Sequence, residues 1–287
     1  MVLSSGSDGM DLLQRINECD EIEIDSIIKE EIEKAQSNAF QVDKLGFLDY
    51  SKSNNIFKGF IPLNTRIKYS NFNMEDYSMN TTDFIYEFAH FIKEHKIKSK
   101  SSLVHNLESF INNYFGYAGK IKREVIFNDI AWQTTTTDEE YFEALKNNKI
   151  SDLKGKGAAE CTERSALAQQ ILSVFGFESY YCMGCVQING RQEAHCFNVV
   201  KRKNDYALLD YSMPIKSFTN GNLSAYYPFI GLLTNDEFLD FINNHTIKSF
   251  EEYYIDNKNK LKLDKERLYV SGKYEIMEEN IEHNIMR

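Results

Sequence analysis

Apolar residues at helical spacing dominate the first third of the chain. Between residues 10 and 35, isoleucines and leucines recur mostly at steps of three or four among many acidic residues, which is the spacing of a helix with one buried face. The same spacing between residues 83 and 115 predicts two helices, with a break near residues 96–101. We therefore expect residues 1–120 to form a mostly helical N-terminal region.

Two other parts of the chain have a weaker pattern. Residues 40–78 are rich in asparagine, serine and aromatic residues without a clean period, and they predict no defined element. Past Pro214 the pattern loosens. In that part, residues 238–242 and 250–254 have helical spacing, and residues 268–276 are predicted to form a pair of strands.

The segment 161–175 has the pattern of a buried helix. Its apolar positions form a face wide enough to be enclosed in a core. Gly176 follows directly, at the point where a residue in the left-handed conformation ends many helices. The apolar positions are Leu167, Ile171 and Val174 on one stripe and Ala168, Leu172 and Phe175 beside it.

Strand patterns follow this helix. Residues 177–188 are rich in aromatic and β-forming side chains, and the Asn-Gly dipeptide at 189–190 is a strong hairpin signal. Residues 195–200 and 206–211 are predicted to form two further strands, joined by the polar turn 201–205. A helix followed by antiparallel strands is typical of an α+β fold.

Two candidate catalytic residues fall on neighbouring predicted strands. Side chains alternate between the two faces of a strand, so the register decides which residues meet. If the loop consists of residues 201–204, Val200 opposes Asp205 and His195 lies directly opposite Asp210, with Cβ atoms about 4.5–5.5 Å apart. A carboxylate in that position fixes the tautomer of an imidazole and stabilises its protonated form. The pattern therefore predicts a His195–Asp210 pair.

A third candidate, Cys161, falls at the start of the predicted helix. The N-terminus of a helix lowers the pKa of a thiol, and its backbone N–H groups can hold an oxyanion. Glu160 and Glu163 act against a lowered pKa, and a single cysteine taken alone is more often a buried structural residue. The predicted His–Asp pair changes that balance and makes Cys161 the candidate nucleophile.

Three stretches carry these residues in order: Gly-Lys-Gly-Ala-Ala-Glu-Cys161-Thr-Glu-Arg-Ser-Ala, Glu-Ala-His195-Cys-Phe-Asn-Val-Val and Tyr-Ala-Leu-Leu-Asp210-Tyr-Ser-Met-Pro. Together they resemble the bacterial transglutaminase-like superfamily, over about residues 132–214. The resemblance implies a papain-like core, in which a nucleophilic cysteine opens a helix and the histidine and aspartate lie on successive strands. Thr162 and Cys196 stand where the family usually has aromatic residues.

The resemblance also implies a reaction. Cys161 would attack a carboxamide or peptide carbonyl to form a thioester, and His195 would pass the thiol proton to the leaving amine. Water then completes hydrolysis or deamidation, whereas an amine completes cross-linking. Trp132 and Gln133 are the candidates for an oxyanion-stabilising residue that the family often has upstream. The implied substrate is a protein or peptide amide, and the reaction requires no metal and no organic cofactor.

Three alternatives remain open. Arylamine N-acetyltransferases use the same triad order but place the nucleophile early, whereas here less than half of the chain follows Cys161. The Cys-x-x-Cys spacing of Cys182 and Cys185 is found in zinc sites. The adjacent pair His195-Cys196 would complete such a site only with a strand bulge, because neighbours on a straight strand point to opposite faces. The third alternative is a partner-binding module with an inactive triad.

The composition of the chain narrows the classes of molecule that it is expected to bind. With a net charge of −10, the chain lacks the electrostatic footprint for nucleic acid or anionic lipid. No stretch approaches the ~20 apolar residues of a membrane span, and the first nine residues lack the apolar run of a secretion signal. The five cysteines are not spaced as a disulfide framework. We expect a cytoplasmic protein without nucleic-acid or membrane partners, although a protein exported by a dedicated secretion machine would have the same composition.

The sequence thus predicts an α+β protein of 287 residues in three parts. These are the helical region 1–120, a transglutaminase-like catalytic core over 121–235, and an extension over 236–287 that packs on the core. A chain of this length can bury roughly three quarters of its unfolded surface, so a large core is expected.

Overall fold

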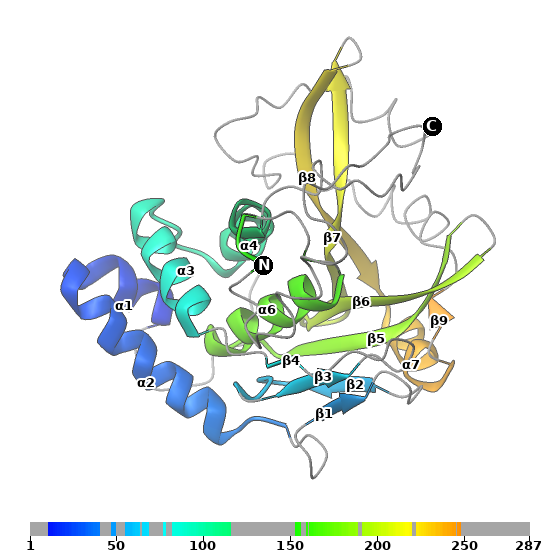
Figure 1. Cartoon of the computed structure of the whole chain (residues 1–287), viewed down its shortest axis with the longest axis horizontal. Helices are drawn as coiled ribbons and strands as arrows, with labels where there is room; N and C mark the ends of the chain where they lie inside the picture. The colour runs from blue at the N-terminus through cyan, green and yellow to red at the C-terminus, as the bar shows by residue number, and fades with distance from the viewer. Residues whose placement is uncertain are drawn as a thin grey trace.

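An antiparallel sheet with helices on both faces forms the centre of the molecule (Figure 1). The fold class is α+β, as the sequence predicts. The computed structural model describes residues 11–40, 47–49, 55–63, 65–68, 77–78, 82–115, 153–155, 159, 161–188, 191–219, 222–244 and 246–247.

The elements have the following bounds. The helices are α1 (Leu12–Glu18), the short 3-10 helix η1 (Glu21–Glu23), α2 (Ile24–Ser37), α3 (Thr82–Glu94), α4 (Lys100–Phe115), α6 (Cys161–Val174) and α7 (Asn235–Asn244). The strands are β1 (Phe47–Asp49), β2 (Asn55–Lys58), β3 (Arg66–Lys68), β4 (Tyr77–Ser78), β5 (Ser179–Ile188), β6 (Arg191–Lys201), β7 (Tyr206–Thr219), β8 (Asn222–Leu233) and β9 (Thr246–Ile247).

The main sheet has the strand order β2-β5-β6-β7-β8, and β9 pairs with β5. Its neighbours along this order are antiparallel, whereas β9 runs parallel to β5. Strand β2 comes from the N-terminal region and pairs with β5 from Asn55 opposite Met183 to Lys58 opposite Tyr180. The N-terminal region therefore supplies an edge of the central sheet as well as helices.

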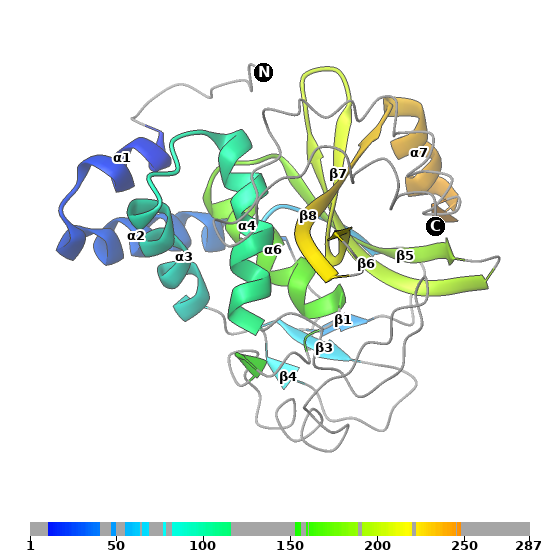
Figure 2. The same ribbon diagram turned by 90° about the horizontal axis from the view of Figure 1, so that it is seen from above.

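Two hydrophobic clusters form the core, one on each face of the sheet. On one face, α6 lies between the sheet and helices α1–α4, and apolar residues of all these elements join in a single cluster. On the other face, Phe238 and Phe241 of α7 pack on Phe197, Val199 and Leu208. Figure 2 shows α7 on the side of the sheet away from α6.

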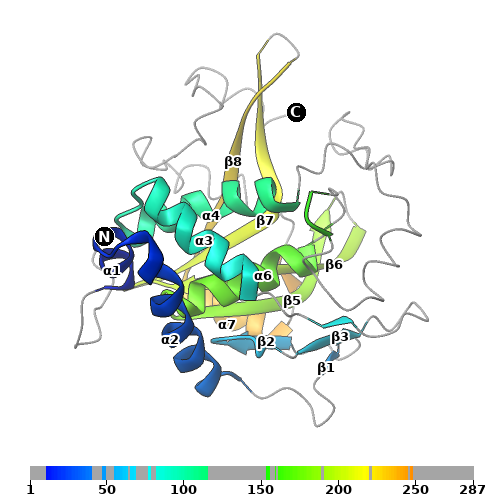
Figure 3. The same ribbon diagram turned by 60° about the vertical axis from the view of Figure 1, so that its left-hand side comes forward.

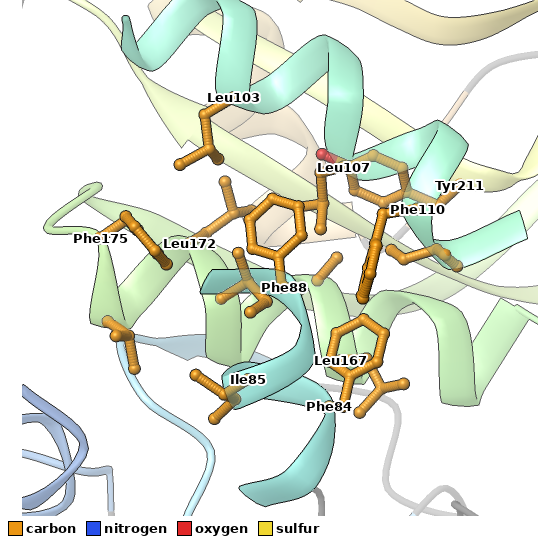
Figure 4. Packing of buried hydrophobic residues seen from close by; sticks show 14 of the residues in the cluster. Phe84, Ile85, Phe88, Leu103, Leu107, Phe110, Leu167, Leu172, Phe175 and Tyr211 are labelled. Atoms are coloured by element: carbon orange, nitrogen blue, oxygen red, sulfur yellow. The ribbon is translucent and has the colours of Figure 1, made fainter. Parts of the chain in front are cut away.

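Phe88 is at the centre of the larger cluster. Its ring lies 5.0 Å from that of Phe110 in α4 and 5.9 Å from that of Phe175 just beyond α6, measured between centroids. Figure 4 shows it surrounded by side chains of α4 and α6. Since aromatic residues bury the largest areas in a core, Phe88 ties the N-terminal helices to the helix that opens with Cys161.

The N-terminal helices differ in detail from the prediction for residues 10–35. The chain bends at Cys19 and Asp20, and the helical part divides into α1 and η1–α2. The N–H group of Asp20 donates a hydrogen bond to the carboxylate of Glu23 at 3.0 Å, an arrangement that starts helices. The Asp-x-x-Glu spacing was visible in the sequence. Helices α3 and α4, separated near residues 96–101, are confirmed.

The end of α6 is confirmed as predicted. Gly176 has a φ of +69°. Its N–H group donates to the carbonyl of Ser173 at 3.1 Å, and the N–H group of Phe177 donates to the carbonyl of Leu172 at 2.9 Å. These two bonds are the Schellman arrangement that satisfies the last carbonyls of a helix.

The predicted register between β6 and β7 is wrong by two residues. Val199 pairs with Leu208 and Lys201 pairs with Tyr206, so the loop consists of residues 202–205. Within this loop the N–H group of Arg202 donates to the carbonyl of Asp205 at 2.8 Å, and their side chains form an ion pair at 3.0 Å. A shift of two residues keeps every side chain on its predicted face, but it removes the direct opposition of His195 and Asp210.

Strands β7 and β8 form a long hairpin that the sequence analysis missed. It extends to the pair Thr219–Asn222, and the intervening Asn220-Gly221 dipeptide is the same hairpin signal that was used at 189–190. The register shifts between Asp210 and Ile215, where Pro214 cannot donate to the ladder. Helix α7 confirms the helical spacing at 238–242. The elements predicted at 250–254 and 268–276, and the domain boundary near 120, lie outside the described residues.

His90 on α3 joins the N-terminal helices through two hydrogen bonds. Its Nδ1 lies 2.8 Å from Oε1 of Glu21, and its Nε2 lies 2.8 Å from Oδ1 of Asp25. Partial burial favours the neutral ring, but the bonds to these two carboxylates outweigh it and raise the pKa of His90. The stabilisation is therefore complete at pH values below the unfolded pKa of about 6.5, and it is lost as the pH rises through the raised folded pKa.

We predict that His90→Gln lowers the melting temperature most near pH 6 and progressively less toward pH 9. The loss stays below about 1 kcal/mol because the pair is partly exposed. Thermal unfolding followed by circular dichroism at several pH values measures this. His95→Gln is the matched control, since Nδ1 of His95 contacts residues of its own helix, the carbonyl of Phe91 at 3.0 Å and the carboxylate of Glu94 at 3.9 Å. A difference between wild type and His90→Gln that grows with pH contradicts the prediction.

Candidate active site at the start of helix α6

Cys161 is the first residue of α6. It is partly exposed, whereas the residues that follow it from Thr162 to Leu172 are all buried. It carries a thiol and takes part in no disulfide. The structure therefore confirms the predicted position of this cysteine, at the N-terminal end of a helix that is enclosed in the core, with its side chain open in part to solvent.

Hydrogen bonds fix the position of α6 along β6. The hydroxyl of Ser165 donates to the carbonyl of Cys196 at 2.9 Å, and one turn later Oε1 of Gln169 accepts from Nδ2 of Asn198 at 3.1 Å. Four helical residues and two strand residues both advance about 6 Å. One further step, of four residues toward the N-terminus of α6 and two residues toward the N-terminus of β6, leads from Ser165 and Cys196 to Cys161 and Ala194. By this step Cys161 is level with Ala194, the neighbour of His195.

The first turn of α6 also lies where two hairpins separate. The ladder between β6 and β7 ends at the pair Asn198–Leu209. Strand β6 then continues with β5 as far as Arg191, and β7 continues with β8 as far as Thr219. Figure 3 shows the β7–β8 hairpin rising away from β6. The backbone of His195 and the residue Asp210 thus lie on the two branches of this fork, just past its base.

Asp210 is fully buried, with 0% of its surface exposed. Leu209 and Tyr211 on either side of it pack in the cluster that contains α6, whereas Leu208 packs in the cluster that contains α7. By alternation Asp210 lies on the face of Leu208. The strand position of His195 alternates with Phe197 onto the same face. A meeting of either residue with the thiol of Cys161 therefore requires the open end of the fork, because the sheet separates the two faces elsewhere.

Two charged residues that the sequence analysis did not assign to the site lie in the first turn of α6. Glu163 and Arg164 are both buried, with 0% and 2% exposure. Nε of Arg164 donates to the carbonyl of Ala159 at 2.8 Å, and the guanidinium lies 5.5 Å from the ring centre of Phe115. These contacts hold the segment that leads into Cys161 against α4. No periodicity signal distinguishes such residues, because charged residues on a helix are usually exposed.

Cys182 and Cys196 are buried, whereas Cys161 is partly exposed. Burial raises the pKa of the Cys182 thiol well above its ordinary value, which favours the protonated, weakly nucleophilic form. Cys182 packs in the cluster that contains α7, whereas Cys196 packs in the cluster that contains α6. A zinc site that uses both residues is therefore contradicted. Within the described ranges, no three histidine, cysteine or acidic side chains gather as metal ligands.

The other predicted site residues are placed only in part. The backbone of His195 pairs with that of Gly184 in the β5–β6 ladder. Trp132 and Gln133 lie outside the described residues. The structure thus positions Cys161 and Asp210 with their side chains and His195 by its backbone, and the oxyanion candidates stay predictions.

Comparisons with known proteins add no assignment. No protein-family model, no curated protein and no solved structure matches this chain. Among the described helices, none has the length and apolar character that crossing a membrane requires.

Proposed function

We propose that the protein is a cysteine-dependent acyl hydrolase or acyltransferase that acts on protein or peptide amides through a thioester. Cys161 is the nucleophile, His195 the general base and acid, and Asp210 the residue that orients the histidine. The observation that carries the proposal is the partly exposed Cys161 at the start of the buried helix α6, one turn before Ser165, which bonds the carbonyl of Cys196 next to His195.

The proposed reaction has two steps. In the first, His195 takes the thiol proton, the sulfur of Cys161 bonds to the amide carbonyl carbon, and the C–N bond breaks as His195 returns the proton to the leaving amine. In the second, His195 takes a proton from water, or from an acceptor amine, which attacks the thioester and releases the thiolate. The products are a carboxylic acid or a new amide.

The first turn of α6 suits the negative charge that forms on the carbonyl oxygen. The first N–H groups of a helix have no carbonyl partner within the helix, and they lie at the positive end of its dipole. Donors held rigidly at such a position stabilise a tetrahedral intermediate. The contacts of Arg164 with Ala159 and Phe115 supply that rigidity at the start of the helix.

A partner-binding module without catalysis is the second candidate. One observation favours it: the strand positions of His195 and Asp210 both alternate onto the face of the sheet that packs with α7, whereas α6 lies on the other face. If the open end of the fork between β6 and β7 does not let the thiol of Cys161 meet the histidine, the chain has no active triad.

Trapping the thioester distinguishes the two candidates and also the type of reaction. We expect intact-protein mass spectrometry, after incubation with a peptide library and a labelled amine, to detect an acyl adduct that peptide mapping assigns to Cys161. Incorporation of the amine into the peptides indicates cross-linking, a gain of about 1 Da in glutamine peptides indicates deamidation, and cleaved peptides indicate proteolysis. Cys161→Ala is the control. No adduct and unchanged peptides, with folded protein, favour the binding module.

A further inference from the structure

A row of buried polar side chains connects α6 to β6. It consists of Thr162, Ser165 and Gln169 on the helix and Cys196 and Asn198 on the strand, and we call it the polar seam. All five residues are at most 2% exposed. A helix packed in a core usually presents apolar residues to a sheet, so a row of this kind has a structural or functional reason.

The hydrogen bonds of the seam are directional. The Ser165 hydroxyl donates to the carbonyl of Cys196 at 2.9 Å, and the Ser165 carbonyl accepts from Nδ2 of Asn198 at 3.0 Å. Ser165 therefore bonds β6 at two successive positions of one face. Further along, Nε2 of Gln169 donates to Oγ of Ser179 at 2.9 Å and to the carbonyl of Gly59 at 2.7 Å.

The hydrogen bond from the Ser165 hydroxyl reaches β6 at Cys196, next to the position of His195. Cys196 directly follows His195, and it lies beyond the pair Asn198–Leu209 where the ladder to β7 ends. A strand that has left one neighbour loses the hydrogen bonds that held it on that side. The Ser165 hydroxyl supplies a donor there, from the same helix that begins with Cys161 one turn earlier.

Apolar contacts alone would not fix the helix along the strand, because they are non-directional. Buried hydrogen bonds do fix it, since a shift would leave their donors and acceptors without partners in the core. The distance between the sulfur of residue 161 and the strand position of residue 195 is therefore set by the seam, and above all by its member closest to both residues.

We infer that Ser165 is a positioning residue for the proposed active site: through the carbonyl of Cys196 it holds the histidine strand at the level of the Cys161 thiol. The inference rests on the proposed function, in which these two side chains exchange a proton. The inference adds that the hydrogen bonds of the polar seam, rather than those of the β6–β7 ladder, set the distance between Cys161 and the strand position of His195.

The test is the pH dependence of Cys161 alkylation by iodoacetamide, measured by peptide mass spectrometry between pH 5.5 and 9. A thiol next to an imidazolium reacts as thiolate at low pH, whereas an ordinary thiol, with a pKa of about 8.5, does not. We expect Ser165→Ala to reduce the rate at pH 6 about tenfold, as the loss of one buried hydrogen bond implies, and to leave the rate at pH 9 unchanged. A change of packing alone would alter the rate at both pH values.

Ser173→Ala is the matched control, because it is the same substitution on the same helix, two turns further from Cys161 and near the seam only at Gln169, at 3.3 Å. We expect it to keep the wild-type profile. If Ser165→Ala does not fold, Thr162→Val decides in its place. This isosteric change removes the weaker contact of Thr162 with the sulfur of Cys196, at 3.7 Å, and we expect a smaller loss at pH 6.

Two outcomes overturn the inference, and they differ. If Cys161 of the wild type is alkylated fast at pH 6 and Ser165→Ala leaves this rate unchanged, Ser165 has no positioning role, whereas the proposed function stands. If the alkylation rate of Cys161 in the wild type depends on pH as that of an ordinary thiol does, both the proposed function and the inference are contradicted.

Discussion

Cys161→Ala is expected to abolish acyl transfer while leaving the fold intact. Removing a nucleophile from a catalytic triad typically lowers kcat by more than about a thousandfold. Cys161 is partly exposed and lies at the end of α6 rather than within the core, so the loss of one sulfur atom creates no large cavity. His195→Ala should cause a loss of similar size, because residues of a triad act as a unit.

The measurement is the rate of amide turnover, with a substrate identified by the trapping experiment. Cys19→Ala is the control, since Cys19 is also partly exposed but follows α1 in the N-terminal helices. Circular dichroism checks that each variant is folded. A Cys161→Ala protein that turns over substrate at the wild-type rate contradicts the assignment of the nucleophile.

Phe88→Ala is expected to have the largest effect on stability. The ring is fully buried and contacts Phe110 and Phe175, on two different helical segments. Removing a buried phenylalanine side chain typically costs about 3–5 kcal/mol, which is a large part of the 5–15 kcal/mol that ordinary domains have. Because one cluster joins α1–α4 to α6, we expect the N-terminal helices and the sheet to lose stability together.

Urea unfolding followed by circular dichroism measures the free energy of unfolding. Leu239→Ala is the control, since 54% of the surface of Leu239 is exposed and such substitutions usually change stability by less than about 0.5 kcal/mol. A loss below 1 kcal/mol for Phe88→Ala, or an N-terminal region that unfolds separately, contradicts the packing described above.

The sequence predicted the elements that have strong local signals. Helix α6, its glycine end and the β5–β6 hairpin each depend on a few neighbouring residues, such as Gly176 and the dipeptide at 189–190. Strands β1–β4 were missed because each has only two to four residues, too few to show a period of two. Strand β2 gains its partner from β5, more than a hundred residues later, and no local pattern reveals such a pairing.

The register of β6 and β7 could not be predicted from the loop between them alone. The loop 201–204 that the sequence predicts is as long as the loop 202–205 of the structure. The Arg202–Asp205 contacts favour the second, and the opposition of His195 and Asp210 is lost with it. Each side chain still lies on its predicted face of the sheet, because the register differs by two residues. The polar seam also escaped notice, because buried serine and glutamine on a helix resemble an exposed face in sequence.

The relative alkylation rate of Cys161 at pH 6 tests the central claim most directly. The protein is treated with iodoacetamide, and peptide mass spectrometry compares the rate at Cys161 with that at Cys19 in the same sample, for wild type and for His195→Ala. We predict that Cys161 of the wild type reacts more than about tenfold faster than Cys19, because an adjacent imidazolium keeps it as thiolate, and that His195→Ala removes this advantage. Equal rates at the two cysteines in the folded wild type, or an advantage that survives His195→Ala, contradict the proposed pair.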